Sequence, residues 1–163
     1  MRRIVVLGCA GSGKTTLARR LGDLTRAPVI CLDDIWQREW TRENIPEFRR
    51  LIDAAHTGEA WISDGNFAQI TFDLRLPRAD LIVWLERPRW GCLWRATTRV
   101  FRTGEAHKAR DLPKALSFIW HFDSRNRPKI EASRRAWGPA VPLVRLATGD
   151  DIASFFQTAQ PQR

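Results

Sequence analysis

The chain has 163 residues, of which 44% are hydrophobic and 28% are charged, the balance of one globular domain with a substantial core. No apolar run approaches the roughly 18 residues that a membrane span needs. The three cysteines are odd in number and lack metal-ligand spacing, which argues against a disulfide framework and a zinc site. We therefore expect a single cytoplasmic domain over residues 1–163, with no membrane partner.

The formal net charge is +9, and nearly all of the positive charge is arginine. Lysine occurs only at positions 14, 108, 114 and 129. Arginine binds phosphate through a two-pronged fork, so this composition suits phosphorylated small substrates and also nucleic acid. A genome-wide arginine bias is a third explanation, and the charge by itself does not choose among them.

A β-branched apolar run at residues 4–7 predicts a buried parallel strand, and residues 16–21 predict a helix with an apolar stripe. Between them, Gly8-Cys9-Ala10-Gly11-Ser12-Gly13-Lys14-Thr15 fits G-x-x-x-x-G-K-[ST], the P-loop pattern. Strand, glycine loop and helix together predict a phosphate site, because loop N–H groups and the helix N-terminus point at the anion. The alternative is a glycine-rich turn without a ligand.

The predicted ligand is ATP with Mg²⁺. Lys14 reaches the β- and γ-phosphates, and the hydroxyl of Thr15 coordinates the metal. Cys9 within the loop is either a somewhat acidic thiol or simply a small residue that fits. The residues predicted to contact the nucleotide are Gly8, Gly11, Ser12, Gly13, Lys14, Thr15 and Thr16.

Residues 29–32 predict the second strand, and Asp33 and Asp34 stand at its carboxyl end. In open parallel sheets ligands bind at that end, so the pair should face the same cleft as the P-loop. One of these carboxylates would orient an acceptor hydroxyl, accept its proton or hold Mg²⁺. The alternative is that one of them caps the next helix. Residues 35–57 are rich in Trp, Arg and Glu, and Trp36 is a candidate wall of the acceptor pocket.

Residues 60–63 predict the third strand, and Asp64-Gly65 follows it. An acid at this strand tip is where a Walker B aspartate holds Mg²⁺, and a simple turn is the alternative. Residues 67–76 form a predicted helix or irregular turn that contains Arg75. We assign acceptor binding to Asp33, Asp34, Trp36 and Arg75.

Residues 79–85 predict the fourth strand, and Pro88 opens a helix in which Arg95, Arg99 and Arg102 share one face. Three like charges on one face predict a phosphate clamp, with a solvated basic face as the alternative. A polar loop at 103–111 and a helix at 112–122 suggest a lid over about 103–127 that brings Arg125 and Arg127 to the γ-phosphate. A fifth strand at 141–146 and a closing helix at 150–156 complete the prediction.

The sequence resembles the adenylate-kinase-like P-loop kinases, and more closely the small bacterial proteins called topology modulation protein or adenylate-kinase-related proteins. The resemblance covers most of residues 1–130. The stretches that carry it are residues 4–21, Leu32-Asp33, Trp61-Ile62-Ser63-Asp64-Gly65-Asn66-Phe67, Asp73-Leu74-Arg75-Leu76, Arg78-Ala79-Asp80 and Pro88-Arg89-Trp90-Gly91-Cys92-Leu93-Trp94-Arg95.

The resemblance implies a three-layer α/β fold with helices on both faces of a five-stranded parallel sheet in the order 2-3-1-4-5. It also implies ATP as the donor and Mg²⁺. Arg95 and Arg99 match in spacing the two arginines at the start of the adenylate kinase lid, and Arg125 and Arg127 match loosely the pair at its end. Asp33 matches in place the substrate-binding aspartate of shikimate- and gluconate-kinase-like enzymes. Asp64-Gly65 stands where adenylate kinases carry Asp-Gly-Phe-Pro, but Asn66-Phe67 replaces Phe-Pro. The arginine that follows in that motif is also missing, because position 68 is alanine. Both departures argue against AMP as the acceptor.

Two functions follow as hypotheses. The first is an ATP-dependent small-molecule kinase with a nucleotide- or nucleoside-like acceptor, acting as a monomer or homodimer. In this enzyme Lys14, Arg95, Arg99, Arg125 and Arg127 neutralise the transferring phosphoryl group. The second is a nucleotide-switched regulator that binds nucleic acid through arginines and aromatics around 84–137. We place it below the kinase because no DNA-binding module appears.

Overall fold

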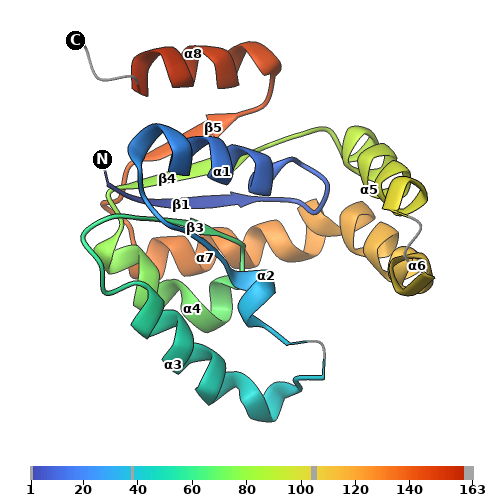
Figure 1. The fold of residues 1–163 in the computed structure, drawn as a ribbon, viewed down its shortest axis with the longest axis horizontal. Helices are drawn as coiled ribbons and strands as arrows, with labels where there is room; N and C mark the ends of the chain where they lie inside the picture. The colour runs from blue at the N-terminus through green and yellow to red at the C-terminus, as the bar shows by residue number, and fades with distance from the viewer. Residues whose placement is uncertain (1, 38, 104–105, 160–163) are drawn as a thin grey trace.

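The computed structural model describes residues 2–37, 39–103 and 106–159, and a five-stranded sheet forms its centre (Figure 1). The strand order is β2-β3-β1-β4-β5, and each neighbouring pair is parallel. The α/β fold class and the strand order are as predicted. The strands are β1 (Arg3–Gly8), β2 (Val29–Cys31), β3 (Trp61–Asp64), β4 (Leu81–Leu85) and β5 (Leu143–Leu146).

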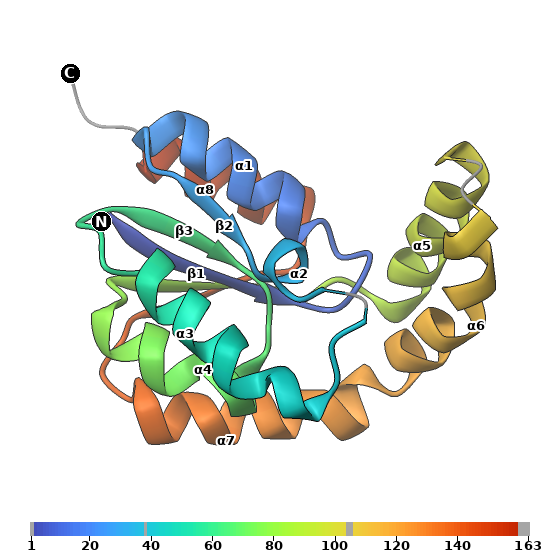
Figure 2. The same ribbon diagram turned by 60° about the horizontal axis from the view of Figure 1, so that its bottom comes forward.

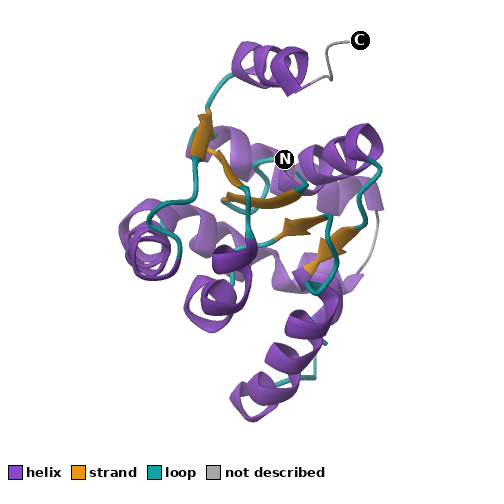
Figure 3. Cartoon of the chain, turned by 90° about the vertical axis from the view of Figure 1, so that its left-hand side faces the viewer, coloured by secondary structure: helices purple, strands orange, loops and turns teal. Residues whose placement is uncertain are grey.

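Helices cover both faces of the sheet, and a helical pair lies beyond its carboxyl edge (Figure 2). One face carries α1 and α8, the other carries α3, α4 and α7, and the pair is α5 with α6. Figure 3 shows the orange strands between the two helical layers. The long helices are α1 (Lys14–Thr25), α3 (Ile45–Ala55), α4 (Ala68–Arg75), α5 (Arg89–Thr103), α6 (Ala106–Trp120), α7 (Arg127–Trp137) and α8 (Gly149–Ala159). The short ones are α2 (Leu32–Ile35), η1 (Arg42–Asn44), η2 (Leu76–Arg78) and the π-turn η3 (Phe122–Asn126).

Two apolar cores arise because successive side chains of a strand point to opposite faces of the sheet. Val5 and Leu7 of β1 belong to the core beneath α4 and α7, whereas Ile4 and Val6 belong to the core beneath α1. All four are 2% exposed or less. A strand buried on both faces explains the continuous apolar run in the sequence.

Parallel pairing brings the functional loops to one edge of the sheet. Asp64, the last residue of β3, pairs with Val6 of β1 and with Cys31 of β2. Gly8, the last residue of β1, pairs with Leu85 of β4. The residues that follow β1, β2, β3 and β4 therefore start from neighbouring positions at the carboxyl edge.

The segment between α5 and η3 differs from its prediction. A polar loop was expected at 103–111, but α6 begins at Ala106, and positions 104 and 105 lie outside the described residues. α5 and α6 pack against each other, and such packing stabilises a helix where composition alone favours a loop. A second difference is that Leu32, expected in the second strand, opens α2. None of the helices in the described ranges combines the length and apolar composition that a bilayer span requires.

Candidate active site

The P-loop is held tightly against β4 and the start of α5. A Cβ on Gly8 would lie 2.7 Å from the carbonyl oxygen of Leu85, and one on Gly11 would lie 2.4 Å from that of Cys92. Both glycines also have positive φ, 150° and 76°. Only glycine meets both conditions without strain. The close backbone approach and the positive φ therefore explain why the P-loop pattern has glycine at positions 8 and 11.

Lys14 and Thr15 open α1 directly after the loop. Nζ of Lys14 donates a 3.0 Å hydrogen bond to the carbonyl oxygen of Cys9, across the loop. Oγ1 of Thr15 donates a 2.6 Å hydrogen bond to Oδ2 of Asp64. The structure thus brings together the two residues predicted to hold the metal, Thr15 at the start of α1 and Asp64 at the end of β3.

Thr15 and Asp64 fit a magnesium ion. Asp64 is 3% exposed, and its Oδ1 has no hydrogen-bond partner among the described residues. A buried carboxylate oxygen without a partner beside a hydroxyl is a suitable donor set for a hard cation. No group of three His, Cys, Asp or Glu side chains in the described ranges could hold a metal. The ion would therefore take most of its remaining ligands from phosphate and water.

Asn66 has a role that the sequence did not reveal. Its Oδ1 accepts a 3.1 Å hydrogen bond from the N–H of Gly8, and its Nδ2 donates a 2.9 Å hydrogen bond to the carbonyl oxygen of Gly8. The side-chain amide therefore pairs with both the N–H and the carbonyl group of Gly8, the first residue of the P-loop. The signal was present in Asp64-Gly65-Asn66, because an amide matches a backbone donor and acceptor together.

Acceptor binding was predicted for Arg75, but the structure places this side chain in the interior. The residue is fully buried, and its guanidinium donates to Oγ of Ser63 at 2.9 Å, to the carbonyl oxygen of Gly65 at 3.1 Å and to that of Asn66 at 2.5 Å. Desolvation lowers the pKa of Arg75 to about 9. Its donors are used in the interior, so Arg75 holds the turn after β3 from behind.

The arginine face of α5 borders the P-loop. Nη1 of Arg95 donates to the carbonyl oxygens of Gly11 and Ser12, at 3.3 and 3.2 Å. A cleft of about 610 Å³ lies between this face and the loop. Its lining includes Gly11, Gly13, Lys14, Thr15, Thr16, Asp33, Arg95, Arg99 and Arg102. The predicted clamp residues Arg95 and Arg99 are thus brought to the predicted nucleotide residues.

Asp33 and Asp34 have different surroundings. Both lie in the first turn of α2 and its N-cap is Cys31, so neither aspartate is the helix cap that the alternative interpretation required. Asp33 lines the cleft, whereas Asp34 lies in the lining of neither cavity at this edge. Desolvation raises the pKa of Asp33, Lys14 lowers it, and Asp64 raises it again, which leaves it above its ordinary value.

A second cavity, of about 500 Å³, lies on the other side of Lys14. The turn after β3, the beginning of α4, α6 and α7 form its walls. The lining residues are Ala10, Lys14, Asp33, Gly65, Asn66, Phe67, Ala68, Gln69, Ile70, Ala115, Phe118, Asn126, Lys129 and Ile130. Three of them, Ala10, Lys14 and Asp33, also line the first cleft, so the two cavities meet at the P-loop.

Trp36 supports this cavity without lining it. Its ring packs against Phe48 and Phe67, with centroids 5.1 and 6.0 Å apart, and against Trp40 at 5.8 Å. The aromatic cluster fixes Phe67, whose φ of 37° is unusual for a non-glycine residue. The prediction that Trp36 forms the wall of the acceptor pocket is therefore corrected to a position behind that wall.

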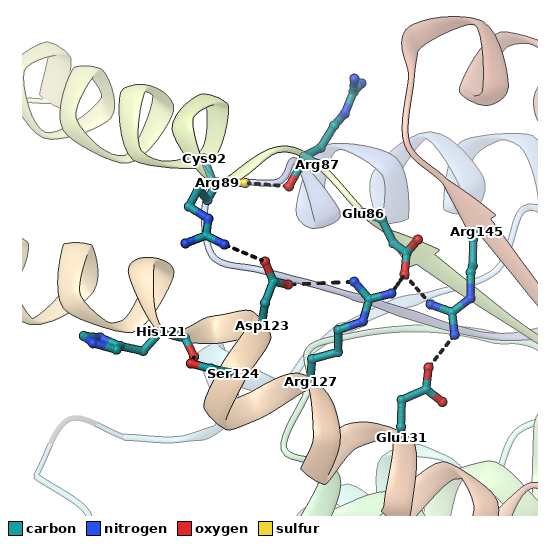
Figure 4. Close-up of polar contacts among 10 residues, drawn as sticks. All are labelled: Glu86, Arg87, Arg89, Cys92, His121, Asp123, Ser124, Arg127, Glu131 and Arg145. Atoms are coloured by element: carbon teal, nitrogen blue, oxygen red, sulfur yellow. Dashed lines mark hydrogen bonds and ion pairs between the residues drawn. The ribbon is translucent and has the colours of Figure 1, made fainter.

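Arg127 is tied to the sheet, away from the predicted γ-phosphate site. Its guanidinium bonds the carboxylate of Glu86, which Arg145 of β5 also bonds, and lies over the ring of Trp84. Figure 4 shows one line of alternating charges, formed by Arg89, Asp123, Arg127, Glu86, Arg145 and Glu131. Ion pairing of Arg127 with Glu86, directly after β4, and with Asp123 of η3 competes with the role assigned from the sequence.

Arg125 is exposed and lines, with Lys114 and His121, a depression that shares Phe118 and Asn126 with the second cavity. Neither Arg125 nor Arg127 is in the lining of the cleft between the P-loop and α5. Cys9 differs as well from the acidic thiol considered above. Its hydrogen bond with Cys92 and its burial raise the pKa of the Cys9 thiol, so the small residue that fits is the better description.

No protein-family model and no curated protein matches the sequence. Solved structures do match. A sugar kinase from Janibacter sp. HTCC2649 has a TM-score of 0.59 and 20% identity, over 97% of this chain and 93% of that chain. Shikimate kinase from Acinetobacter baumannii, in complex with shikimate, has a TM-score of 0.63 and 17% identity, over 97% and 92%. A gluconokinase from Sinorhizobium meliloti 1021 has a TM-score of 0.56 and 16% identity, over 96% and 87%.

All three identities are below 25%, so the similarity shows the fold and leaves the acceptor open. It gives no support that is specific to topology modulation proteins. The match extends over nearly the whole of each chain, and the strand order is the predicted one. The chain has the fold of the P-loop small-molecule kinases.

Proposed function

We propose that this protein is an ATP-dependent phosphotransferase that transfers the γ-phosphoryl group to a hydroxyl of a small nucleotide- or nucleoside-like molecule. One observation carries the proposal: Lys14 and Asp33 line both the P-loop cleft and the cavity beside it. A phosphoryl donor in the cleft and an acceptor in the cavity would then meet at the same two side chains. Such positioning is the main source of catalysis in this reaction class.

On the donor side, charge compensation is the main task. Lys14 would reach the β- and γ-phosphates, and Arg95 and Arg99 would contact the triphosphate from α5. Mg²⁺, when bound by Thr15 and Asp64, would neutralise phosphate charge. Fixed cations in a cleft stabilise the charge that develops on the transferring group.

On the acceptor side, Asp33 is the residue with the right chemistry. The acceptor oxygen attacks the γ-phosphorus, the bond from that phosphorus to the β–γ bridging oxygen breaks, and ADP leaves. The hydroxyl proton passes to the carboxylate of Asp33. A pKa above the ordinary value makes this carboxylate a stronger proton acceptor.

A second candidate function is nucleotide-switched binding of nucleic acid, as the resemblance to topology modulation proteins suggests. The observation that favours it is a set of exposed aromatic side chains on α5, where Trp90, Trp94 and Phe101 are 69, 71 and 77% exposed. Aromatic rings beside arginines can stack on unpaired bases. We place it second because Arg95 and Arg99 line the nucleotide cleft.

The test compares three variants of the purified protein. Mg-ATP should raise the melting temperature of the wild type, and Lys14→Ala should remove that shift. Asp33→Asn should keep the shift but lower acceptor-dependent ADP release by about 100-fold or more. Asp34→Asn is the matched control and should behave like the wild type.

An unchanged ATP shift in Lys14→Ala would refute the P-loop assignment. DNA binding that persists at physiological salt, with no acceptor-dependent ADP release for any compound in a panel of nucleosides, nucleotides, sugars and hydroxy acids, would favour the second function.

A further inference from the structure

We infer that the acceptor is an uncharged alcohol with a flat ring, of the nucleoside class, rather than a phosphorylated or carboxylated compound. The inference rests on the proposed function and concerns the 500 Å³ cavity beside Lys14. It goes beyond that function because it separates nucleosides from nucleotides and from hydroxy acids.

The walls of the cavity are largely apolar. Phe67 and Ile70 come from the turn and first residues of α4, and Phe118 and Ile130 come from α6 and α7. Phe67 packs against Phe48, with ring centroids 5.0 Å apart, so this wall is backed by a fixed aromatic cluster. Rigid aromatic and branched side chains suit the face of a ring, and a cavity of this size holds a molecule of one or two rings.

The charges of the lining do not suit an anion. Its ionisable side chains among the described residues are Lys14, Asp33 and Lys129. Lys14 serves the phosphoryl group that is transferred, and the carboxylate of Asp33 repels a second negative charge. Of the described lining side chains, this leaves Lys129 to balance a phosphate or carboxylate on the acceptor, and lysine lacks the fork that makes anion binding strong.

Two of the described arginines near this cavity, Arg49 and Arg75, are engaged elsewhere. The exposed Arg125 lies outside the lining, in an adjoining depression that shares Phe118 and Asn126 with the cavity. Arg49 of α3 reaches α4, but its two terminal nitrogens bond the carboxylate of Asp73 at 2.9 and 2.5 Å. Arg75 is fully buried behind the turn. Breaking the Arg49 contacts to bind an anion would leave Asp73 without its arginine partner. Breaking the Arg75 contacts would remove the donor from two hydroxyl and two carbonyl oxygens, and either loss is costly.

The polar groups that remain suit neutral hydrogen bonding. Asn66 is already paired with Gly8, so Gln69 and Asn126 supply the amides in the lining. Amides match the donors and acceptors on the edge of a heterocyclic base. Two features of this cavity argue the other way: Lys129 in the lining, and the N-terminus of α4 at Ala68, which favours an anion weakly.

The test is acceptor-dependent ADP release with Mg-ATP, measured for matched pairs. Each of the common ribonucleosides and 2′-deoxyribonucleosides is compared with its own 5′-monophosphate, and gluconate and shikimate represent carboxylated alcohols. We expect at least one nucleoside to have a kcat/KM about 100-fold or more above that of its monophosphate and above both acids, because an unpaired charge in the cavity is rejected strongly.

A higher kcat/KM for any monophosphate or acid would overturn the inference and leave the kinase proposal intact. Turnover of a neutral sugar from the wider panel above, with none of the nucleosides, would overturn the requirement for a flat ring. Absence of turnover with every compound, although Mg-ATP still stabilises the protein, would overturn the kinase proposal as well.

A variant tests the aromatic wall separately. Phe118→Ala should raise the KM of the preferred nucleoside by about tenfold, equivalent to about 1.4 kcal/mol, while the thermal shift with Mg-ATP stays at the wild-type value. Trp137→Ala is the matched control, since Trp137 is 52% exposed and lies outside the lining of both cavities. An unchanged KM in Phe118→Ala would contradict ring recognition by this wall.

Discussion

The hydroxyl of Thr15 and the carboxylate of Asp64 are joined by a 2.6 Å hydrogen bond that connects α1 to the end of β3. Oδ1 of Asp64 is buried without a partner among the described residues. This pair places an acidic group next to the P-loop hydroxyl, as Mg-nucleotide binding requires. The contact links residues that the sequence indicated separately, and it leads to the first prediction.

Asp64→Asn should weaken ATP binding only when Mg²⁺ is present. The amide keeps the size of the side chain but loses the charge, so we expect the Kd of Mg-ATP to rise about tenfold or more, with the Kd of metal-free ATP near the wild-type value. Titration calorimetry with and without Mg²⁺ measures both. Asp23→Asn, an exposed residue of the same helix as Thr15, is the control. Equal loss under both conditions would contradict a metal role.

Arg95→Ala should be far more damaging than Arg125→Ala. Arg95 bonds the P-loop carbonyls of Gly11 and Ser12, whereas Arg125 lies outside the lining of the P-loop cleft. We expect kcat to fall about 100-fold for Arg95→Ala and to stay near the wild type for Arg125→Ala. Steady-state kinetics at saturating ATP decides. Equal losses would restore the lid role that the sequence suggested for Arg125.

Arg75→Met should destabilise the protein by about 3 kcal/mol or more, since the loss of a buried guanidinium leaves several acceptors unsatisfied. Ser63 Oγ and the carbonyl oxygens of Gly65 and Asn66 would lose their donor. Urea denaturation measures the change in the free energy of unfolding.

Arg75→Lys should recover only part of this loss, because an ammonium cannot reproduce the fork. Arg19→Met, at an exposed position of α1, is the control and should lie close to the wild type. If Arg75→Met also lies close to the wild type, the interior network contributes little to stability.

His56 should make stability depend on pH between about 6.5 and 4. The residue is 1% exposed, its Nδ1 bonds the carbonyl oxygen of Ile52, and its Nε2 bonds Oγ of Ser63. Burial lowers the pKa of His56 to about 4. As the pH falls below 6.5, His56 becomes protonated in the unfolded chain but stays neutral in the folded chain. The free energy of unfolding therefore decreases until about pH 4, by about 3 kcal/mol in all.

Urea titrations between pH 7.5 and 4.5 test this slope, and His56→Gln should flatten it in that range. If the free energy of unfolding of the wild type is constant between pH 6.5 and 5, His56 is protonated in the folded protein as readily as in the unfolded chain, and the prediction is wrong.

The P-loop and the strand order were accessible to sequence reasoning because they depend on local rules and on one resemblance. Gly8, Gly11, Lys14 and Thr15 are close together along the chain, and their spacing carries the chemistry. The strand tips that bear Asp33 and Asp64 follow from apolar runs and from the common edge of a parallel sheet. For the same reason the fold class needed no knowledge of side-chain contacts.

Choices among similar side chains depended on the tertiary structure. Nothing local distinguishes Asp33 from Asp34, or Arg75, Arg125 and Arg127 from Arg95. Arg75 is buried and bonds the turn after β3, and Arg127 pairs with the carboxylate of Glu86. Arg95, in contrast, borders the cleft beside the P-loop. The sequence alone determined the parallel sheet and the phosphate loop, because these arise from short-range patterns. Only the folded chain decided which arginines are buried or ion-paired, which of them border the P-loop cleft, and how apolar the walls of the second cavity are, because these depend on which partners lie close together in space.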